Sequence, residues 1–228
     1  MTTRHIRALS LGVILLACAT AVAGGAGTPG VTADAALQRL MEGNKRFVTS
    51  HVTYRALTIK KTREGLVRGQ KPYAIILSCS DSRVPPEIIF DETLGQLFVV
   101  RVAGNILDPV VLGSIEYAVE HLGPALIMVL GHEACGAVTS AYDATDKVGG
   151  NVDAVIEPIM PAVLKAKETM KDKSLSEQVE AAIDINVDLV AEGLTTRSSL
   201  IKDYVDRGVL KIVKGKYHLY RGEVTLLK

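Results

Sequence analysis

The 228-residue chain has few cysteines, few aromatic residues and almost no excess of one charge. Its three cysteines are too few for a domain held together by disulfides. The 26 basic side chains barely outnumber the 25 acidic ones, so the sequence lacks the basic footprint of a protein that binds nucleic acid. After the N-terminal segment no apolar run reaches about 18 residues, which excludes a membrane span. With no Trp and three Phe, we expect an aliphatic core in a soluble globular enzyme or binding domain.

The first residues are arranged as a secretory signal. Arg4 and Arg7 make a positive start, residues 8–16 are apolar, and small residues follow as far as Ala23. This order predicts a signal peptide and therefore export to the periplasm of a bacterium. The alternative is a lipid anchor on Cys18, because the residues before it resemble a lipoprotein box. We divide the chain into a signal peptide over 1–23, a flexible lead-in over 24–31 and one domain over 32–228.

Short apolar runs alternate with helical patterns through the rest of the chain. The runs that predict strands cover 73–77, 96–102, 125–130 and 209–213, and a last strand or hairpin covers 217–227. Strands that are apolar throughout and separated by helices are typical of a parallel sheet covered on both faces. The sequence therefore predicts a single α/β domain with a mostly parallel central β-sheet flanked by helices.

Capping residues and prolines mark two of the predicted helices. Ser174 and Glu177 have the spacing of a capping box, so we expect a helix to begin there. Proline removes one backbone hydrogen bond from a helix and crowds the preceding turn. Pro158 and Pro161 therefore predict that the helix over 152–170 is kinked or split.

Both cysteines of the domain follow predicted strands. Cys79 comes directly after the first strand, and Cys135 lies three residues beyond His132, which follows another. Ligand sites of open α/β sheets gather at these carboxyl ends of strands. Two thiolates and one imidazole are a known set of catalytic zinc ligands that leaves one coordination position open. Asp81, close to Arg83, could complete the tetrahedron or bond a zinc-bound water.

Other interpretations of these residues stay open at this point. Cys79 could be a small buried hydrophobe, or it could form a disulfide with Cys135 in an oxidising compartment. A lone His-x-x-Cys pattern also occurs by chance. A disulfide gives no reason for His132, Asp81 and Arg83 to lie at the same strand ends, so we favour the metal site.

The same residues resemble the motifs of the β-class carbonic anhydrases. That family carries Cys-x-Asp-x-Arg and His-x-x-Cys, which occur here from Cys79 to Arg83 and from His132 to Cys135. Two supporting blocks also match in order and spacing, at 98–105 and 113–118. The resemblance extends over roughly the whole of the predicted domain.

The resemblance implies the β-carbonic anhydrase fold and a zinc lyase, a carbonate dehydratase. Cys79, His132 and Cys135 would bind one Zn²⁺ per chain, and zinc-bound hydroxide would hydrate carbon dioxide reversibly to bicarbonate and a proton. Asp81 and Arg83 would form the catalytic dyad, in which Asp81 accepts a hydrogen bond from that hydroxide. If Arg83 released it, Asp81 could become the fourth zinc ligand and close the site.

Four further positions match the substrate pocket of the family: Gln70, Phe98, Tyr117 and Gly136. The side-chain amide of Gln70 and the backbone amide of Gly136 would bond an oxygen of carbon dioxide or bicarbonate. Phe98 and Tyr117 would make the pocket apolar, although they could equally be ordinary core or interface residues. The resemblance also implies a homodimer or homotetramer in which pocket residues cross the interface.

Three other functions are compatible with the sequence. One is hydrolysis of carbon disulfide or carbonyl sulfide on the same scaffold, and another is zinc binding without catalysis, which the presence of Asp81 and Arg83 disfavours. A third is thiol–disulfide chemistry, which the lack of a Cys-x-x-Cys arrangement disfavours. Three histidines belong to no motif, and we expect all of them at the surface: His51, His121 and His218.

Overall fold

A computed structural model describes residues 30–53 and 60–228. The predicted signal peptide, most of the lead-in and Cys18 lie outside the described residues, so export and lipidation stay predictions. Within the described part of the chain, no helix has the length and apolar character that crossing a membrane requires.

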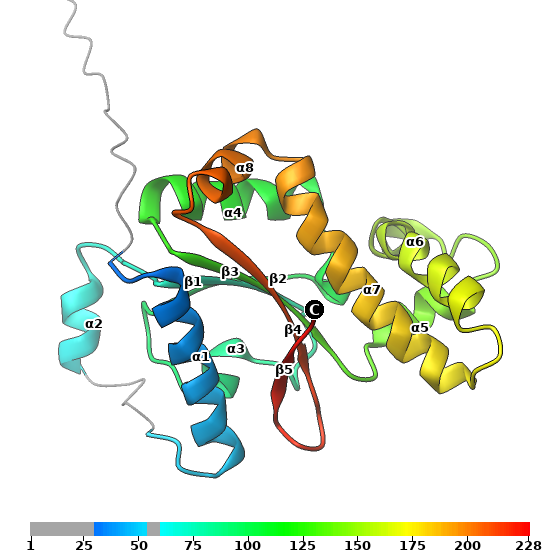
Figure 1. The fold of residues 1–228 in the computed structure, drawn as a ribbon, viewed down its shortest axis with the longest axis horizontal. Coiled ribbons are helices and arrows are strands. Elements are labelled where there is room, and N and C mark those ends of the chain that lie inside the picture. The colour runs from blue at the N-terminus through cyan, green and yellow to red at the C-terminus, as the bar shows by residue number, and fades with distance from the viewer. Residues whose placement is uncertain (1–29, 54–59) are drawn as a thin grey trace, which may run out of the picture.

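One five-stranded sheet forms the centre of the molecule (Figure 1). Its strands are β1 (Ala74–Ser78), β2 (Leu97–Arg101), β3 (Leu126–His132), β4 (Lys211–Tyr217) and β5 (Val224–Leu226). They lie in the order β2-β1-β3-β4-β5, and only the last pair is antiparallel. The prediction of a mostly parallel sheet is confirmed.

Helices cover both faces of this sheet. They are α1 (Ala33–Val48), α2 (Lys60–Leu66), α3 (Pro86–Ile89), α4 (Pro109–Leu122), α5 (Gly136–Asp143), α6 (Asp153–Thr169), α7 (Leu175–Thr196) and α8 (Ser199–Asp206), with short 3₁₀ turns at Ala103–Asn105 and Gly150–Val152. Side chains of the central strands alternate between the faces. Ile75 and Ile127 pack with α4, α7 and α8, whereas Ile76 and Met128 pack with α1 and α3. All four side chains are fully buried, which explains the continuous apolar runs in the sequence.

The predicted capping box is present at the start of α7. Ser174 accepts a hydrogen bond from the backbone N–H of Glu177, and the Glu177 side chain bonds back to Ser174. Of the predicted alternatives for the helix over 152–170, kinked or split, the split is wrong, because α6 continues through Pro158 and Pro161. Both prolines are exposed, and the opposite face of the helix packs in the core.

The predicted strand over 209–213 was placed too early. In the structure β4 starts at Lys211 and continues to Tyr217, pairing with β3 as far as His132. The predicted strand ended before Lys214 and Lys216, because lysines are unexpected in a buried parallel strand. Carboxylates of α7 lie 2.7–2.9 Å from the ammonium groups of Lys214 and Lys216. These ion pairs compensate for the burial of the two lysines in the strand.

Candidate metal centre

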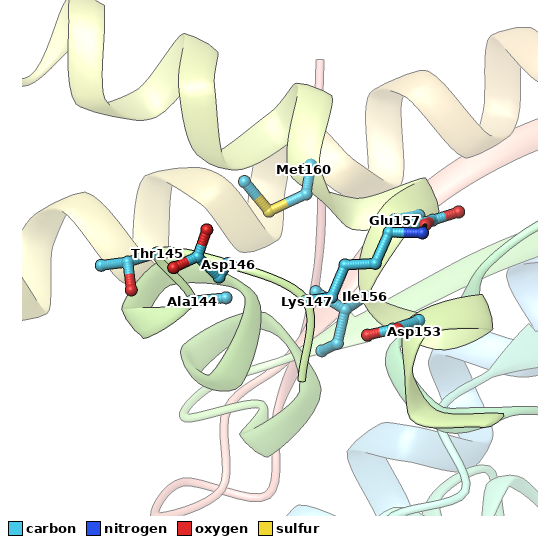
Figure 2. Close-up of a pocket in the computed structure, with 8 residues that line it drawn as sticks. All are labelled: Ala144, Thr145, Asp146, Lys147, Asp153, Ile156, Glu157 and Met160. Carbon is cyan, nitrogen blue, oxygen red and sulfur yellow. Dashed lines mark ion pairs between the residues drawn. The ribbon is translucent and has the colours of Figure 1, made fainter. Parts of the chain in front are cut away.

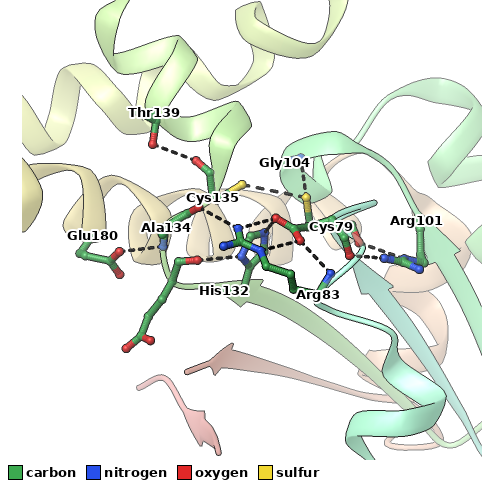
Figure 3. Close-up of polar contacts among 11 residues, drawn as sticks. Cys79, Arg83, Arg101, Gly104, His132, Ala134, Cys135, Thr139 and Glu180 are labelled. Carbon is green, nitrogen blue, oxygen red and sulfur yellow. Dashed lines mark hydrogen bonds and ion pairs between the residues drawn. The ribbon is translucent and has the colours of Figure 1, made fainter. Parts of the chain in front are cut away.

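The three predicted metal ligands meet at one edge of the sheet (Figure 3). Cys79 follows β1, His132 ends β3, and Cys135 precedes the first residue of α5. Because β1 and β3 are parallel neighbours, their carboxyl ends lie side by side. The ligand atoms of the three residues lie within 4.8 Å of one another, and all three residues are buried.

The geometry of this cluster fits a tetrahedral metal ion. The two sulfurs are 4.0 Å apart, which is about twice the length of a disulfide bond. Two sulfurs bound to one tetrahedral zinc ion at about 2.3 Å would lie about 3.8 Å apart. His132 Nε2 is buried without a hydrogen-bond partner, whereas Nδ1 lies 2.8 Å from the carbonyl oxygen of Glu133. A carbonyl can only accept, so Nδ1 carries the proton and Nε2 offers its lone pair to the centre of the cluster.

The surroundings of the cluster favour a thiolate. The contact with Cys135 lowers the pKa of the Cys79 thiol, even though burial opposes the charge. The same contact, together with burial, raises the pKa of Cys135. The backbone N–H of Gly104 also donates to the sulfur of Cys79, at 3.3 Å. One negative charge is therefore already stabilised here, and a divalent cation would stabilise the second.

Asp81 and Arg83 form a tight ion pair beside the cluster. Arg83 donates to Asp81 Oδ1 from Nε at 2.9 Å and to Oδ2 from Nη2 at 2.7 Å. These bonds from Arg83 are the main reason that the pKa of Asp81 falls to about 2. Asp81 Oδ2 lies 3.9 Å from His132 Nε2, close to the ligands but not among them. The carboxylate is thus ionised and lies beside the cluster without being part of it.

Arg101, to which the sequence assigned no role, fixes the loop after β1. Arg101, at the end of β2, donates to the carbonyl of Cys79 at 3.0 Å and to that of Asp81 at 2.6 Å. Arg101 therefore holds the backbone that carries one predicted metal ligand, Cys79, and the carboxylate of the predicted dyad, Asp81. The motif block around 98–105 contained this arginine, but nothing in the block indicated that the side chain turns toward the loop.

Helix α7 contacts the loop after β3 and the turn after β2, which the sequence did not predict. Glu180 accepts a hydrogen bond from the backbone N–H of Ala134 at 2.9 Å, and Asn186 donates to the carbonyl of Gly104 at 2.9 Å. Gly131 lets this helix come close, because a Cβ there would lie 2.6 Å from a methyl group of Val187. The site is therefore built from strand ends on one side and from α7 on the other.

The prediction that His218 lies at the surface is wrong. Its side chain is only 14% exposed, and its ring lies 2.5 Å from a carboxylate oxygen of Glu133 and 2.9 Å from the hydroxyl of Thr225. Glu133 follows the predicted ligand His132, so these bonds connect the hairpin of β4 and β5 to the candidate metal centre. His51 and the half-exposed His121 agree with the prediction.

The four predicted substrate residues occupy different places. Gly136, the first residue of α5, adjoins the ligand Cys135. Phe98 lies half-buried in the edge strand β2, and Tyr117 is 52% exposed on α4. Gln70 is exposed before the amino end of β1, so that strand, about 17 Å long, separates it from Cys79. Within one chain, the structure does not bring Gln70 to the cluster.

A hollow elsewhere in the molecule contains none of the predicted site residues. It has a volume of about 170 Å³, lies between the loop after α5 and the start of α6, and is shown in Figure 2. Lys147 and Glu157 form an ion pair of 3.5 Å at its edge, and Asp153 accepts hydrogen bonds from backbone amides. Two of the acidic residues that line it, Asp153 and Glu157, therefore already have partners.

Known proteins are similar to this chain in sequence and in fold. Residues 74–224 match the family described as carbonic anhydrase. Carbonic anhydrase 2 of Mycobacterium tuberculosis is 41% identical over 204 residues, which is 87% of this chain and 94% of the relative. The β-carbonic anhydrase of Coccomyxa, solved in complex with acetazolamide, has a TM-score of 0.68 at 25% identity over 84% of this chain and 86% of its own. A tetrameric β-carbonic anhydrase of Sordaria macrospora has a TM-score of 0.67 at 24% identity over 84% and 96%.

Proposed function

This chain belongs to the β-class carbonic anhydrases, and from that premise we propose that one zinc ion per chain serves its reversible hydration of carbon dioxide to bicarbonate and a proton. The observation that carries the proposal is the buried cluster of Cys79, His132 and Cys135 beside an ionised Asp81. Two thiolates and one imidazole leave one position of a tetrahedral ion free for water.

Cys79, His132 and Cys135 would hold the ion. Zinc bound there would supply Lewis acidity that lowers the pKa of water to near 7, and so would provide a nucleophile at neutral pH. Asp81 would accept a hydrogen bond from the attacking water and so direct its free lone pair toward carbon dioxide. Arg83 engages both oxygens of Asp81, which keeps this carboxylate charged and prevents it from taking the free position. Such an arrangement corresponds to an open site.

The experiment that tests this proposal combines metal analysis with stopped-flow carbon dioxide hydration on the purified wild-type protein. We expect about one zinc per chain and a hydration rate that disappears when a chelator removes the metal and returns when zinc is added. Carbonyl sulfide is the control substrate. A metal-free active protein, or a zinc protein that turns over only carbonyl sulfide, would contradict the proposal.

We further propose that the chain assembles into a dimer or tetramer through the edge strand β2 and the exposed side of α4. On that helix Val110 is 77% exposed and Tyr117, one heptad later, is 52% exposed, which makes an apolar stripe that a partner can cover. Such an interface would also allow Gln70 of one chain to approach the site of another.

Light scattering on the purified protein should give the mass of two or four chains, and Val110→Asp should shift it to one chain. Asp is tolerated in the first turn of a helix, so the substitution tests the interface and not the stability of α4. Val67→Asp is the matched control, because Val67 is 82% exposed at a different place. A fully active monomeric wild type would refute the assembly.

A further inference from the structure

The peptide group between Glu133 and Ala134 connects the metal centre with α7 (Figure 3). Its carbonyl oxygen lies 2.8 Å from His132 Nδ1, and its N–H donates to Glu180 Oε1 at 2.9 Å. One planar group therefore has a ligand imidazole at its oxygen and a carboxylate at its nitrogen. Since the His132 hydrogen bond decides which ring nitrogen is free for the metal, the orientation of this peptide matters to the site.

The backbone at Ala134 does not favour this orientation by itself. Its φ is 50°, in the left-handed region where the Cβ of an L residue is crowded. A half-turn of the Glu133–Ala134 peptide would bring φ to the negative side and relieve the crowding. The same half-turn would carry the carbonyl oxygen away from His132 Nδ1. A group outside the turn must therefore hold the peptide in the observed orientation.

Glu180 is such a group, and it is itself firmly held. Its second oxygen, Oε2, lies 2.7 Å from Nζ of Lys216, a β4 residue whose side chain is only 8% exposed. Asp184, one turn further along α7, lies 2.9 Å from the same Nζ but has no bond to the turn at Ala134. Arg83 supports the turn from its other side through the Ala134 carbonyl, at 3.3 Å.

We propose that Glu180 is a positioning residue of the metal site: by accepting the N–H of Ala134 it keeps the Glu133 carbonyl on His132 Nδ1, and so keeps His132 Nε2 directed at the ion. This inference rests on the proposed function in that His132 must bind the ion. Groups that orient a ligand in this indirect way typically change metal affinity about 10–100-fold when they are removed.

The test is Glu180→Gln, with zinc affinity measured by competition with a chelator. Glu180 receives hydrogen bonds from two donors, Ala134 N–H and Lys216 Nζ, whereas glutamine has one acceptor oxygen. The charged Lys216 would take that oxygen and leave Ala134 without a partner. We expect the zinc dissociation constant to rise about 10–100-fold. Asp184→Asn is the matched control, since it removes the charge of the other carboxylate that pairs with Lys216, and it should leave the zinc affinity unchanged.

A second substitution separates orientation from charge. Glycine adopts a φ of 50° without crowding, so adding Ala134→Gly to Glu180→Gln should restore part of the zinc affinity. A loss caused by charge alone would not recover. Equal losses in Glu180→Gln and Asp184→Asn, or no recovery with Ala134→Gly, would overturn the role of Glu180 while the proposed function stands. A wild type that binds no zinc would overturn both.

Discussion

Replacing Asp81 with asparagine is expected to lower kcat for carbon dioxide hydration by about 10²–10⁴-fold while zinc stays bound. Asparagine keeps the size of the side chain but loses the charge through which Asp81 pairs with both donor groups of Arg83. The amide can also turn its NH₂ group toward the attacking water, where a hydrogen-bond acceptor is needed. Stopped-flow hydration together with zinc analysis of the same sample measures both quantities.

The pH dependence makes this expectation more specific. Because the bonds from Arg83 lower the pKa of Asp81 to about 2, the carboxylate is ionised throughout the neutral range. A group with a lowered pKa loses its charge only when the pH falls through that lowered value. The deficit of Asp81→Asn should therefore be similar at every pH between about 6 and 9. A deficit that appears only on the acidic side would mean that Asp81 titrates there.

Asp91→Asn is the matched control for this experiment. Asp91 also pairs with an arginine, since its Oδ2 lies 2.5 Å from Nε of Arg46. Burial raises the pKa of Asp91, but the bonds from Arg46 and Thr53 outweigh it and lower the pKa overall. The pair joins α1 to the residues after α3 and lies outside the metal centre, so kcat should stay at the wild-type level. Equal kcat values for Asp81→Asn and the wild type would refute the role of Asp81.

Replacing Cys79 with serine is expected to lower the zinc content from about one ion per chain to nearly none, and to abolish hydration with it. Cys79 is 5% exposed, so no water can easily replace its sulfur as a ligand. A serine hydroxyl does not ionise near neutral pH and cannot supply the thiolate that the site provides. The variant should also lose the thermal stabilisation that added zinc gives the wild type, because only the folded chain binds the ion.

Ser80→Ala is the control for this second prediction. Ser80 lies in the same loop and is exposed, and no metal ligand is changed, so zinc and activity should both persist. Mass spectrometry of the wild type without reductant tests the alternative that Cys79 and Cys135 form a disulfide. Full zinc occupancy in Cys79→Ser, or a wild type isolated with a bond between Cys79 and Cys135, would contradict the metal site.

Local features explain how much of the fold could be predicted from sequence. The central strands are buried on both faces, so each appears as an unbroken apolar run. Where tertiary contacts compensate for an unfavourable residue, the prediction failed. Lys216 made the second half of β4 look unlike a buried strand, because the carboxylates that pair with it lie on α7. Pro158 suggested a kinked or split helix, although α6 continues through it.

The sequence by itself determined which residues we propose as ligands. Cys79 directly follows β1, His132 ends β3 and Cys135 lies three residues later, and the carboxyl ends of neighbouring parallel strands lie side by side. Asp81 and Arg83 are two residues apart, so their pairing is also a local matter.

Only the tertiary structure decided what holds those ligands. Glu180 is 46 positions from Ala134, and His218 is 85 positions from Glu133. Whether such side chains meet depends on how closely α7 and the β4–β5 hairpin approach the strand ends, which is set by packing at places such as Gly131. Spacing along a strand or helix carries information about one element only, whereas the orientation of a ligand depends on contacts between elements.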